Sequence, residues 1–178
     1  MLIRTGQTGV IAAFDVYYQE DGYSSAAAVC MDGYADAQPA GVYSAQRPNV
    51  ERYVPGEFYR RELPCILGLL NMIPIAVRAI IVDGYVRLGG RPGLGQHLFS
   101  VLGSCIPVVG VAKSEFRGAG GVPVLRGRSR RPLYITAAGM DADAAAGNIR
   151  RMHGPYRIPT LLKRADQLAR EQAGRNGV

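Results

Sequence analysis

The first third of the chain carries apolar runs that predict β-strands. Residues 10–18, "VIAAFDVYY", are rich in β-branched and aromatic side chains, and Asp21-Gly22 just after them is a strong hairpin-turn signal. The runs at 25–31 and, more weakly, at 41–45 predict a second and a third strand. We therefore expect the chain to begin with an antiparallel meander.

Helical and strand patterns alternate in the middle of the chain. Apolar residues recur at helical spacing from 56 to 72, where Pro64 either kinks the helix or marks its true first turn. The continuous apolar runs at 78–86 and 105–114 are typical of strands buried on both faces, and residues 93–104 between them predict a short helix. This order favours parallel strands joined by crossover helices.

The last third combines a loop, a strand and two helices. The Gly- and Arg-rich segment 115–132 predicts a loop that contains a short hairpin, residues 133–139 a strand, and residues 141–152 and 160–172 helices. An antiparallel hairpin that feeds a parallel sheet is an α/β layered fold, whose ligands bind beyond the carboxyl ends of the parallel strands. We expect one domain over residues 1–178.

The composition shows a net basic charge, and the sequence shows neither a signal-peptide pattern nor a membrane span. With 21 Lys and Arg against 14 Asp and Glu, the formal charge is +7 and the pI is about 9.6. This balance suits nucleic acid first and an anionic membrane second, although a basic protein with no polyanionic partner fits equally well. No run approaches the ~18 to 20 apolar residues of a membrane span, and the start lacks a signal-peptide pattern. Cys30, Cys65 and Cys105 read as buried free thiols of a reducing compartment, so we expect a cytoplasmic protein.

Three carboxylates stand where a structural role is hard to find. Asp15 lies inside a strand pattern, Asp83 ends a buried strand, and Glu62 shares a helical face with Ile66 and Leu69. A buried, unpaired carboxylate costs several kcal/mol, so such groups are usually neutralised, paired or bound to a metal. Taken singly, each has an ordinary alternative: an edge residue, a turn residue, and an acid that pairs with a neighbouring arginine.

The three acids together indicate a site for a hard divalent cation. Mg²⁺ binds a few carboxylates, keeps some waters and accepts phosphate oxygens, and two such ions ~4 Å apart activate water for phosphodiester hydrolysis. Lys113, just past a buried strand, would neutralise phosphate or orient the water; a solvated lysine at a strand end is the alternative.

Several stretches of the sequence, in the expected order, resemble the endonuclease V family, whose members act at deoxyinosine. The stretches that carry the resemblance are "AAFDVYY" (12–18), "RYVPGEFYRRELP" (52–64), "IIVDGYV" (80–86), "RPGLGQHL" (91–98), "VVGVAKS" (108–114) and "YRIPTLLKRAD" (156–166). The resemblance covers most of the chain.

The resemblance implies an RNase H-like fold, with a mixed sheet flanked by helices, and a set of site residues. It makes Asp15, Glu62 and Asp83 the metal ligands and gives Lys113 a catalytic supporting role. It also implies DNA-binding residues, namely a wedge of Tyr53, Val54 and Pro55 that enters the duplex, and a pocket for the flipped hypoxanthine at Gly56, Gly84 and Gly110.

The function implied is a monomeric DNA repair endonuclease that does not bind membranes. It would depend on Mg²⁺, with Mn²⁺ as a substitute, and would nick DNA at the second phosphodiester 3′ of deoxyinosine by metal-activated water. Two alternatives stay open: the same chemistry on inosine-containing RNA or on mismatched or branched DNA, and a lesion-binding protein that does not cleave.

Two positions depart from the family pattern. Met140 stands where the family has a histidine after the last strand, and Tyr85 replaces the histidine of an Asp-Gly-His-Gly pattern. Asp141 or Asp143 would supply the missing metal ligand, but a helix cap is the commoner role for such an aspartate.

The loop after Lys113 is short and basic. It could follow the phosphates of a nucleic acid, although a solvated loop is the usual outcome for such a run. Its arginines are Arg117, Arg126, Arg128, Arg130 and Arg131.

Overall fold

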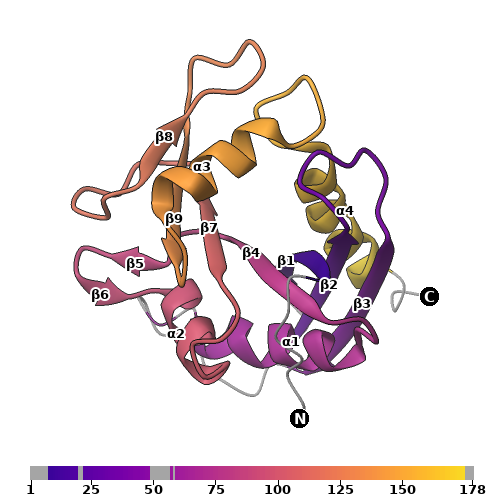
Figure 1. The fold of residues 1–178 in the computed structure, drawn as a ribbon. Coiled ribbons are helices and arrows are strands. Elements are labelled where there is room, and N and C mark those ends of the chain that lie inside the picture. The colour runs from indigo at the N-terminus through magenta and orange to yellow at the C-terminus, as the bar shows by residue number, and fades with distance from the viewer. Residues whose placement is uncertain (1–7, 20–21, 49–56, 58, 175–178) are drawn as a thin grey trace.

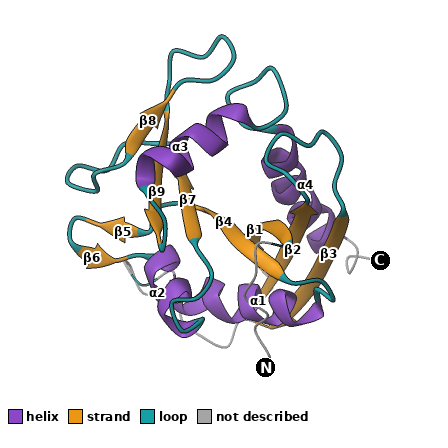
Figure 2. Cartoon of the chain, viewed as in Figure 1, coloured by secondary structure: helices purple, strands orange, loops and turns teal. Residues whose placement is uncertain are grey.

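The protein folds around one mixed β-sheet, shown in Figure 1 as a computed structural model that describes residues 8–19, 22–48, 57 and 59–174. Seven strands lie in the order β3-β2-β1-β4-β7-β9-β8, and four helices flank them (Figure 2). The strands of the main sheet are β1 (Val10–Tyr18), β2 (Tyr23–Met31), β3 (Gly41–Pro48), β4 (Val77–Asp83), β7 (Val108–Ala112), β8 (Val122–Val124) and β9 (Leu133–Ala138). The helices are α1 (Tyr59–Met72), α2 (Leu94–Val101), α3 (Ala142–Arg151) and α4 (Thr160–Gly174), and a small separate hairpin consists of β5 (Arg87–Leu88) and β6 (Arg91–Pro92).

The strand directions confirm the predicted combination of a meander and parallel strands. β1 pairs antiparallel with β2, which pairs antiparallel with β3, and on its other side β1 runs parallel to β4. β4 is parallel to β7, whereas β9 is antiparallel to both β7 and β8. The predicted loop contains the short strand β8, which pairs with the separately predicted strand β9 rather than forming a hairpin inside the loop. The β5–β6 hairpin carried no strand pattern, because two residues per strand are too few to show a period.

Two apolar layers hold the helices against the two faces of the sheet. On one face Ile66 and Leu69 of α1 and Leu98 of α2 pack against the sheet. On the other, Ile149 of α3 and Ala165 of α4 pack against it. The side chains of β1 and β4 alternate between these layers, as the continuous apolar runs predicted. Pro64 lies inside α1 rather than at its start.

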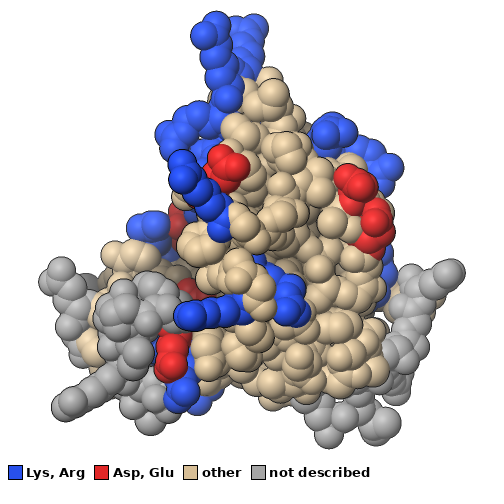
Figure 3. All heavy atoms as spheres, turned by 90° about the vertical axis from the view of Figure 1, so that its left-hand side faces the viewer, with Lys and Arg blue, Asp and Glu red and all other residues tan. Residues whose placement is uncertain are grey.

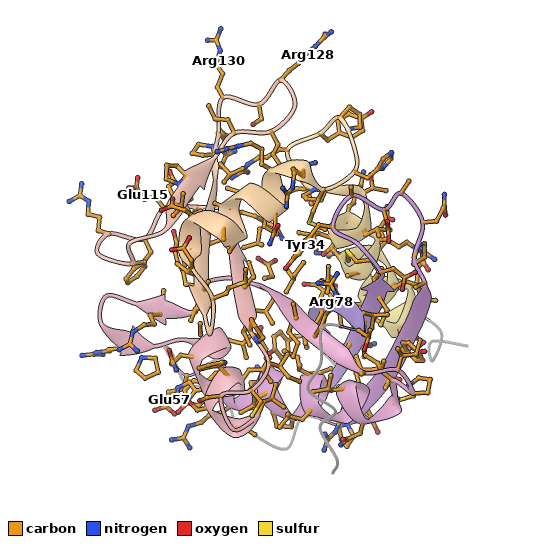
Figure 4. The ribbon with its side chains drawn as sticks, in the orientation of Figure 1. Tyr34, Glu57, Arg78, Glu115, Arg128 and Arg130 are labelled. Carbon is orange, nitrogen blue, oxygen red and sulfur yellow. The ribbon has the colours of Figure 1, made fainter. Side chains whose placement is uncertain are left out.

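The basic loop contains one arginine that serves the fold. Arg126 is only 6% exposed, and its guanidinium donates hydrogen bonds to backbone carbonyls of the segment that follows α3, among them Tyr156 O at 2.9 Å and Gly154 O at 3.2 Å. Arg126 is therefore neither solvated nor available to phosphates, unlike the two roles considered for the arginines of this run. Arg128 and Arg130, by contrast, project from the tip of the loop (Figure 4).

The three cysteines are free thiols, but one of them is exposed. Cys30 and Cys65 lie in the core, whereas Cys105 stands at the surface in the turn after α2. The prediction that all three are buried was wrong for Cys105, because the buried part of the next apolar run begins at Ile106. Within the described ranges, no helix is both long and apolar enough to cross a membrane.

Close packing at the centre of the sheet makes Gly110 sensitive to substitution. A Cβ atom there would lie 2.6 Å from Gly84 O and 2.7 Å from Thr136 Oγ1, so Gly110→Ala should destabilise the protein by about 1 to 3 kcal/mol. Urea unfolding followed by circular dichroism measures this loss. Gly147→Ala on α3 is the matched control, because a Cβ there meets nothing within 4 Å and should stabilise the helix by up to about 1 kcal/mol. An unchanged free energy of unfolding for Gly110→Ala would contradict the close packing inferred at this position.

Candidate catalytic centre at the carboxyl edge of the sheet

The register of three parallel strands brings Asp15, Asp83 and Lys113 together on one face of the sheet. Phe14 pairs with Val82, so Asp15 and Asp83 stand one residue further along the adjacent strands β1 and β4. Asp83 pairs with Val111 of β7, and Lys113, two residues on, points to the same face. Lys113 Nζ lies 2.6 Å from Asp83 Oδ2, in an ion pair whose side chains are 49% and 44% exposed.

Asp166 of α4, which was not among the three predicted acids, joins Asp15, Asp83 and Lys113. It lines the same cavity as Asp15, Asp83 and Lys113. Burial tends to raise the pKa of Asp166, but Arg170, through its hydrogen bond and its charge, and Lys113 together outweigh burial, so the pKa lies below its usual value. Arg170 Nε donates to Asp166 Oδ1 at 3.0 Å.

Asp166 was missed in the sequence although a signal was present. The stretch "YRIPTLLKRAD" was noted only for its resemblance. Leu162, Asp166 and Ala169 follow each other at spacings of four and three, so the acid lies on the apolar stripe of its helix. The same reasoning that singled out Glu62 would have found it.

Burial and like charge disfavour ionisation of Asp15. The pKa of Asp15 rises to about 7, first because the carboxyl is buried and then because Asp83 and Asp166 are nearby, while Lys113 partly offsets the rise. At neutral pH this carboxyl is thus poised between its protonated and charged forms.

Glu62 approaches the group from the other face of the sheet, on α1. Its pKa also rises to about 7, because it is buried and because Asp83 and Asp15 repel its charge; Tyr18 and Arg61 act in the opposite direction. Arg61 stacks over the Tyr18 ring at 4.2 Å. Glu62 therefore interacts electrostatically with the two strand acids, although it does not line the cavity.

The donor set fits a hard divalent cation. Asp15, Glu62, Asp83 and Asp166 offer only carboxylate oxygens. Burial first, and then the charges of neighbouring acids, raise the pKa values of Asp15 and Glu62, and a bound cation would oppose both effects. Among the described residues, however, no three His, Cys, Asp or Glu side chains stand close enough to form a ready-made metal site. Lys113 holds one oxygen of Asp83, so side chains must rotate for an ion to bind.

A cavity of about 490 Å³ opens beside these acids, between the sheet and α4. Its inner surface is mainly apolar, and the charged groups stand with it along the carboxyl ends of the strands. The lining residues are Ala13, Phe14, Asp15, Ile81, Val82, Asp83, Val111, Lys113, Tyr156, Arg157, Ile158, Leu162, Lys163, Ala165 and Asp166.

The remaining predicted residues have different positions. Gly84, at φ +103°, has open space where a Cβ would be, whereas Gly110 is buried under the Gly84 backbone. Asp141 caps α3 by accepting a hydrogen bond from Ala144 N at 2.8 Å, which is the alternative role named for it. Neither Asp141 nor Asp143 lines the cavity.

The predicted wedge lies outside the described residues. This holds for Tyr53, Val54 and Pro55, and also for the predicted pocket residue Gly56.

Tyr85 anchors the loop that follows Lys113. It is one of the two positions that depart from the family pattern. Its hydroxyl donates to Ser114 O at 2.8 Å and accepts from Phe116 N at 3.0 Å. The Phe116 ring leans against Tyr85 with ring centroids 6.3 Å apart. The exposed Glu115 lies between the two anchored residues (Figure 4).

The raised pKa values predict an unusual pH dependence for the free energy of unfolding of the metal-free protein. A carboxyl whose pKa is higher in the folded state than in the unfolded state binds more protons when folded, so stability falls as pH rises from about 4 to about 7. Asp15→Asn should therefore stabilise the protein by about 1 to 3 kcal/mol at pH 8 and leave its stability nearly unchanged at pH 4. Urea unfolding in a chelating buffer measures both values. Asp32→Asn, at an exposed turn, is the control, and the same pH profile for Asp15→Asn as for the parent protein would contradict the assignment.

Sequence comparisons place the chain among the endonucleases V. A family model described as endonuclease V matches residues 3–124. The endonuclease V of Nostoc punctiforme is 30% identical over 181 residues, which cover 89% of this chain and 81% of the relative. That of Streptomyces avermitilis is 31% identical over 192 residues, covering 92% and 80%.

Solved structures agree with the sequence comparisons. The crystal structure of endonuclease V from Streptomyces avermitilis has a TM-score of 0.74 at 29% identity and covers 94% of this chain and 82% of its own. Human ENDOV, at 23% identity, covers 92% and 84% with a TM-score of 0.76. The Ciona intestinalis endonuclease V, crystallised with a 24mer DNA that contains an inosine followed by a ribo-adenosine, has a TM-score of 0.77 at 17% identity, covering 94% and 87%. These likenesses confirm the RNase H-like fold.

Proposed function

The chain belongs to the endonuclease V family and is a nuclease, a hydrolase of phosphodiester bonds; from this premise we propose that it is a DNA repair enzyme that acts at deoxyinosine. The proposed cut is at the second phosphodiester 3′ of the lesion, with Mg²⁺ as the cofactor and Mn²⁺ as a substitute. The observation that carries the proposal is the convergence of Asp15, Asp83 and Asp166 beside Lys113 at one edge of the sheet.

Other features support DNA as the substrate. The net charge of +7 favours a polyanion, and basic side chains stand out on the face shown in Figure 3. The inosine-containing DNA bound by the Ciona intestinalis protein is in keeping with this choice. We place the enzyme in the cytoplasm, where its free cysteines would stay reduced.

The acids would hold the metal, and the metal would supply an activated water and charge stabilisation for the leaving oxygen. Asp15 and Asp83 would bind it from adjacent strands, Glu62 from α1 and Asp166 from α4. A bound cation would oppose the burial and the repulsion that raise the pKa of Asp15 and of Glu62, so it would favour the charged form of both acids at neutral pH.

Lys113 acts as a cation rather than as a base. Burial tends to lower its pKa, but the hydrogen bond and charge of Asp83, with the charges of Asp15 and Asp166, raise it above its usual value. The ammonium therefore keeps its proton at neutral pH. Once Asp83 turns to the metal, Lys113 is free to donate to a phosphate oxygen and to stabilise the charge of the transition state.

The lesion would be held on the α1 side of the strand edge. Gly84 leaves open space at a positive φ, where backbone groups can approach a flipped base. Gly110 lies directly behind Gly84 and would support it by packing. Tyr53, Val54 and Pro55 would enter the duplex as the wedge, and Gly56 would line the pocket beside it.

Nicking of an inosine-containing duplex in Mg²⁺ tests the function. The parent protein should nick the end-labelled strand beyond the inosine and leave an undamaged duplex intact. Asp83→Asn should cut on the order of a hundredfold more slowly, since one positioned group that stabilises transition-state charge is worth about 10²- to 10³-fold. Asp32→Asn is the charge-matched control. Equal rates on inosine and undamaged duplexes, or an unaffected Asp83→Asn, would refute the proposal; inosine RNA and flap DNA assayed in parallel test the alternative substrates.

Substitution of Lys113 tests its role as a cation. Lys113→Gln should lower kcat on the order of a hundredfold while the shape of the pH–rate profile is kept, because a group that stays protonated contributes no ionisation near neutral pH. Lys113→Arg keeps the charge and should retain a larger part of the rate. A profile that loses an ionisation in Lys113→Gln would identify the lysine as a base instead.

A further inference from the structure

The cavity beside the acids has the size and the lining of a binding site for a small, largely apolar group. Its base consists of Ala13, Ile81 and Val111, each two residues before one of the groups Asp15, Asp83 and Lys113 on the same strand. Leu162 of α4 and Ile158 form its sides. Its volume of about 490 Å³ lies within the range of small-ligand sites, about 300 to 1,000 Å³, and exceeds what an amino-acid side chain needs.

The side chains at the mouth of the cavity suit a nucleotide. Tyr156 lines the cavity, yet 71% of its surface is exposed, so its side chain is accessible to a stacking partner. Arg157 and Lys163 also line it, and they bring positive charge next to an apolar surface. An aromatic ring with neighbouring cations is the usual combination for a nucleobase and its phosphates.

The wall that carries Tyr156 is held in place. The buried Arg126 binds the carbonyl oxygens of Met152, Gly154 and Tyr156. Arg157 in turn donates to Pro132 O at 2.7 Å and to the carbonyl oxygen of Lys113. These bonds fix the loop between α3 and α4 to the strand end that bears the catalytic lysine, so little conformational freedom is lost when a ligand binds.

The position of the cavity relative to the acids selects one nucleotide of the substrate. The cavity opens on the face of the sheet covered by α4, whereas α1, which the proposed wedge precedes in the chain, covers the opposite face. A strand that brings its lesion to the α1 side and its scissile phosphate to the acids at the edge must continue onto the α4 side.

We propose that the cavity binds the base of the nucleotide immediately 3′ of the scissile phosphate, stacked on Tyr156. This site rests on the proposed function, because it takes its substrate from that reaction. It would hold the 5′ nucleotide of the downstream product and so fix the phosphate over Asp15 and Asp83 before cleavage. Any base would be accepted, since the apolar walls offer stacking rather than a pattern of hydrogen bonds.

A cycle of protein and substrate changes tests the site. The inosine duplex is compared with one that has an abasic analogue at the nucleotide 3′ of the scissile phosphate, and kcat/KM is measured in Mg²⁺. For the unmodified protein the abasic change should lower kcat/KM about tenfold, because stacking of one base on an aromatic ring contributes about 5- to 100-fold. For Tyr156→Ala, and for Leu162→Trp, which places an indole in the space proposed for the base, the abasic change should have almost no further effect.

Matched controls separate this site from general damage. Tyr23→Ala removes another exposed tyrosine, and Leu168→Trp enlarges another leucine of α4 that does not line the cavity; both should keep the tenfold abasic penalty. An abasic analogue five nucleotides further 3′ should have no effect on any variant. Circular dichroism of each variant checks that it is folded. Because Tyr156→Ala and Leu162→Trp change different parts of the cavity, they test the same site independently.

The outcomes are distinct for the two proposals. Inosine-dependent nicking with the same abasic penalty in all variants would overturn the nucleobase site alone. The absence of inosine-dependent nicking by the unmodified protein would overturn the proposed function, and the nucleobase site with it.

Discussion

Asp15 and Asp83 are held close together, because they occupy neighbouring positions on the adjacent parallel strands β1 and β4. The register of these strands is fixed by the core beneath them. Shifting either strand by one residue would separate the acids but would also turn every core side chain of that strand to the wrong face. The stability of the apolar layers therefore maintains the crowding of negative charge. Fold and chemistry are linked through this register, because the charge of Asp83 adds to the rise in the pKa of Asp15 that burial causes first.

Around this crowded edge, each cation has a separate task. Lys113 pairs with Asp83 and interacts with the acids from the end of β7. Arg170 holds one oxygen of Asp166 and lies over the ring of Tyr17, which keeps that carboxylate charged and oriented. Arg126 and Arg157 donate hydrogen bonds to main-chain carbonyls and so shape the cavity wall, where Arg157 also brings positive charge. A basic sequence has thus produced arginines with quite different functions.

Much of the fold and part of the site could be predicted from sequence. The apolar runs gave the strands, and acids within or at the end of those runs drew attention to Asp15 and Asp83 because burial there needs a reason. Asp166 was missed since its helix was considered only for its resemblance to the family, and the apolar stripe that carries the acid was not examined. Arg126 could not be predicted at all, because a buried guanidinium in a Gly- and Arg-rich loop gives no periodic signal. Gly110 was assigned to a ligand pocket, and the distances around it show that packing against Gly84 O and the Thr136 side chain also requires a glycine.

The Tyr85 hydroxyl holds the loop after Lys113 through hydrogen bonds that do not depend on pH in the physiological range. Burial raises the pKa of this hydroxyl above its already high usual value, so it keeps its proton under all physiological conditions and can bond Ser114 and Phe116 at the same time. An imidazole in this place would change its charge within the range in which cells operate. An enzyme built this way should keep the shape of this loop during acid stress, when a titrating anchor would release it.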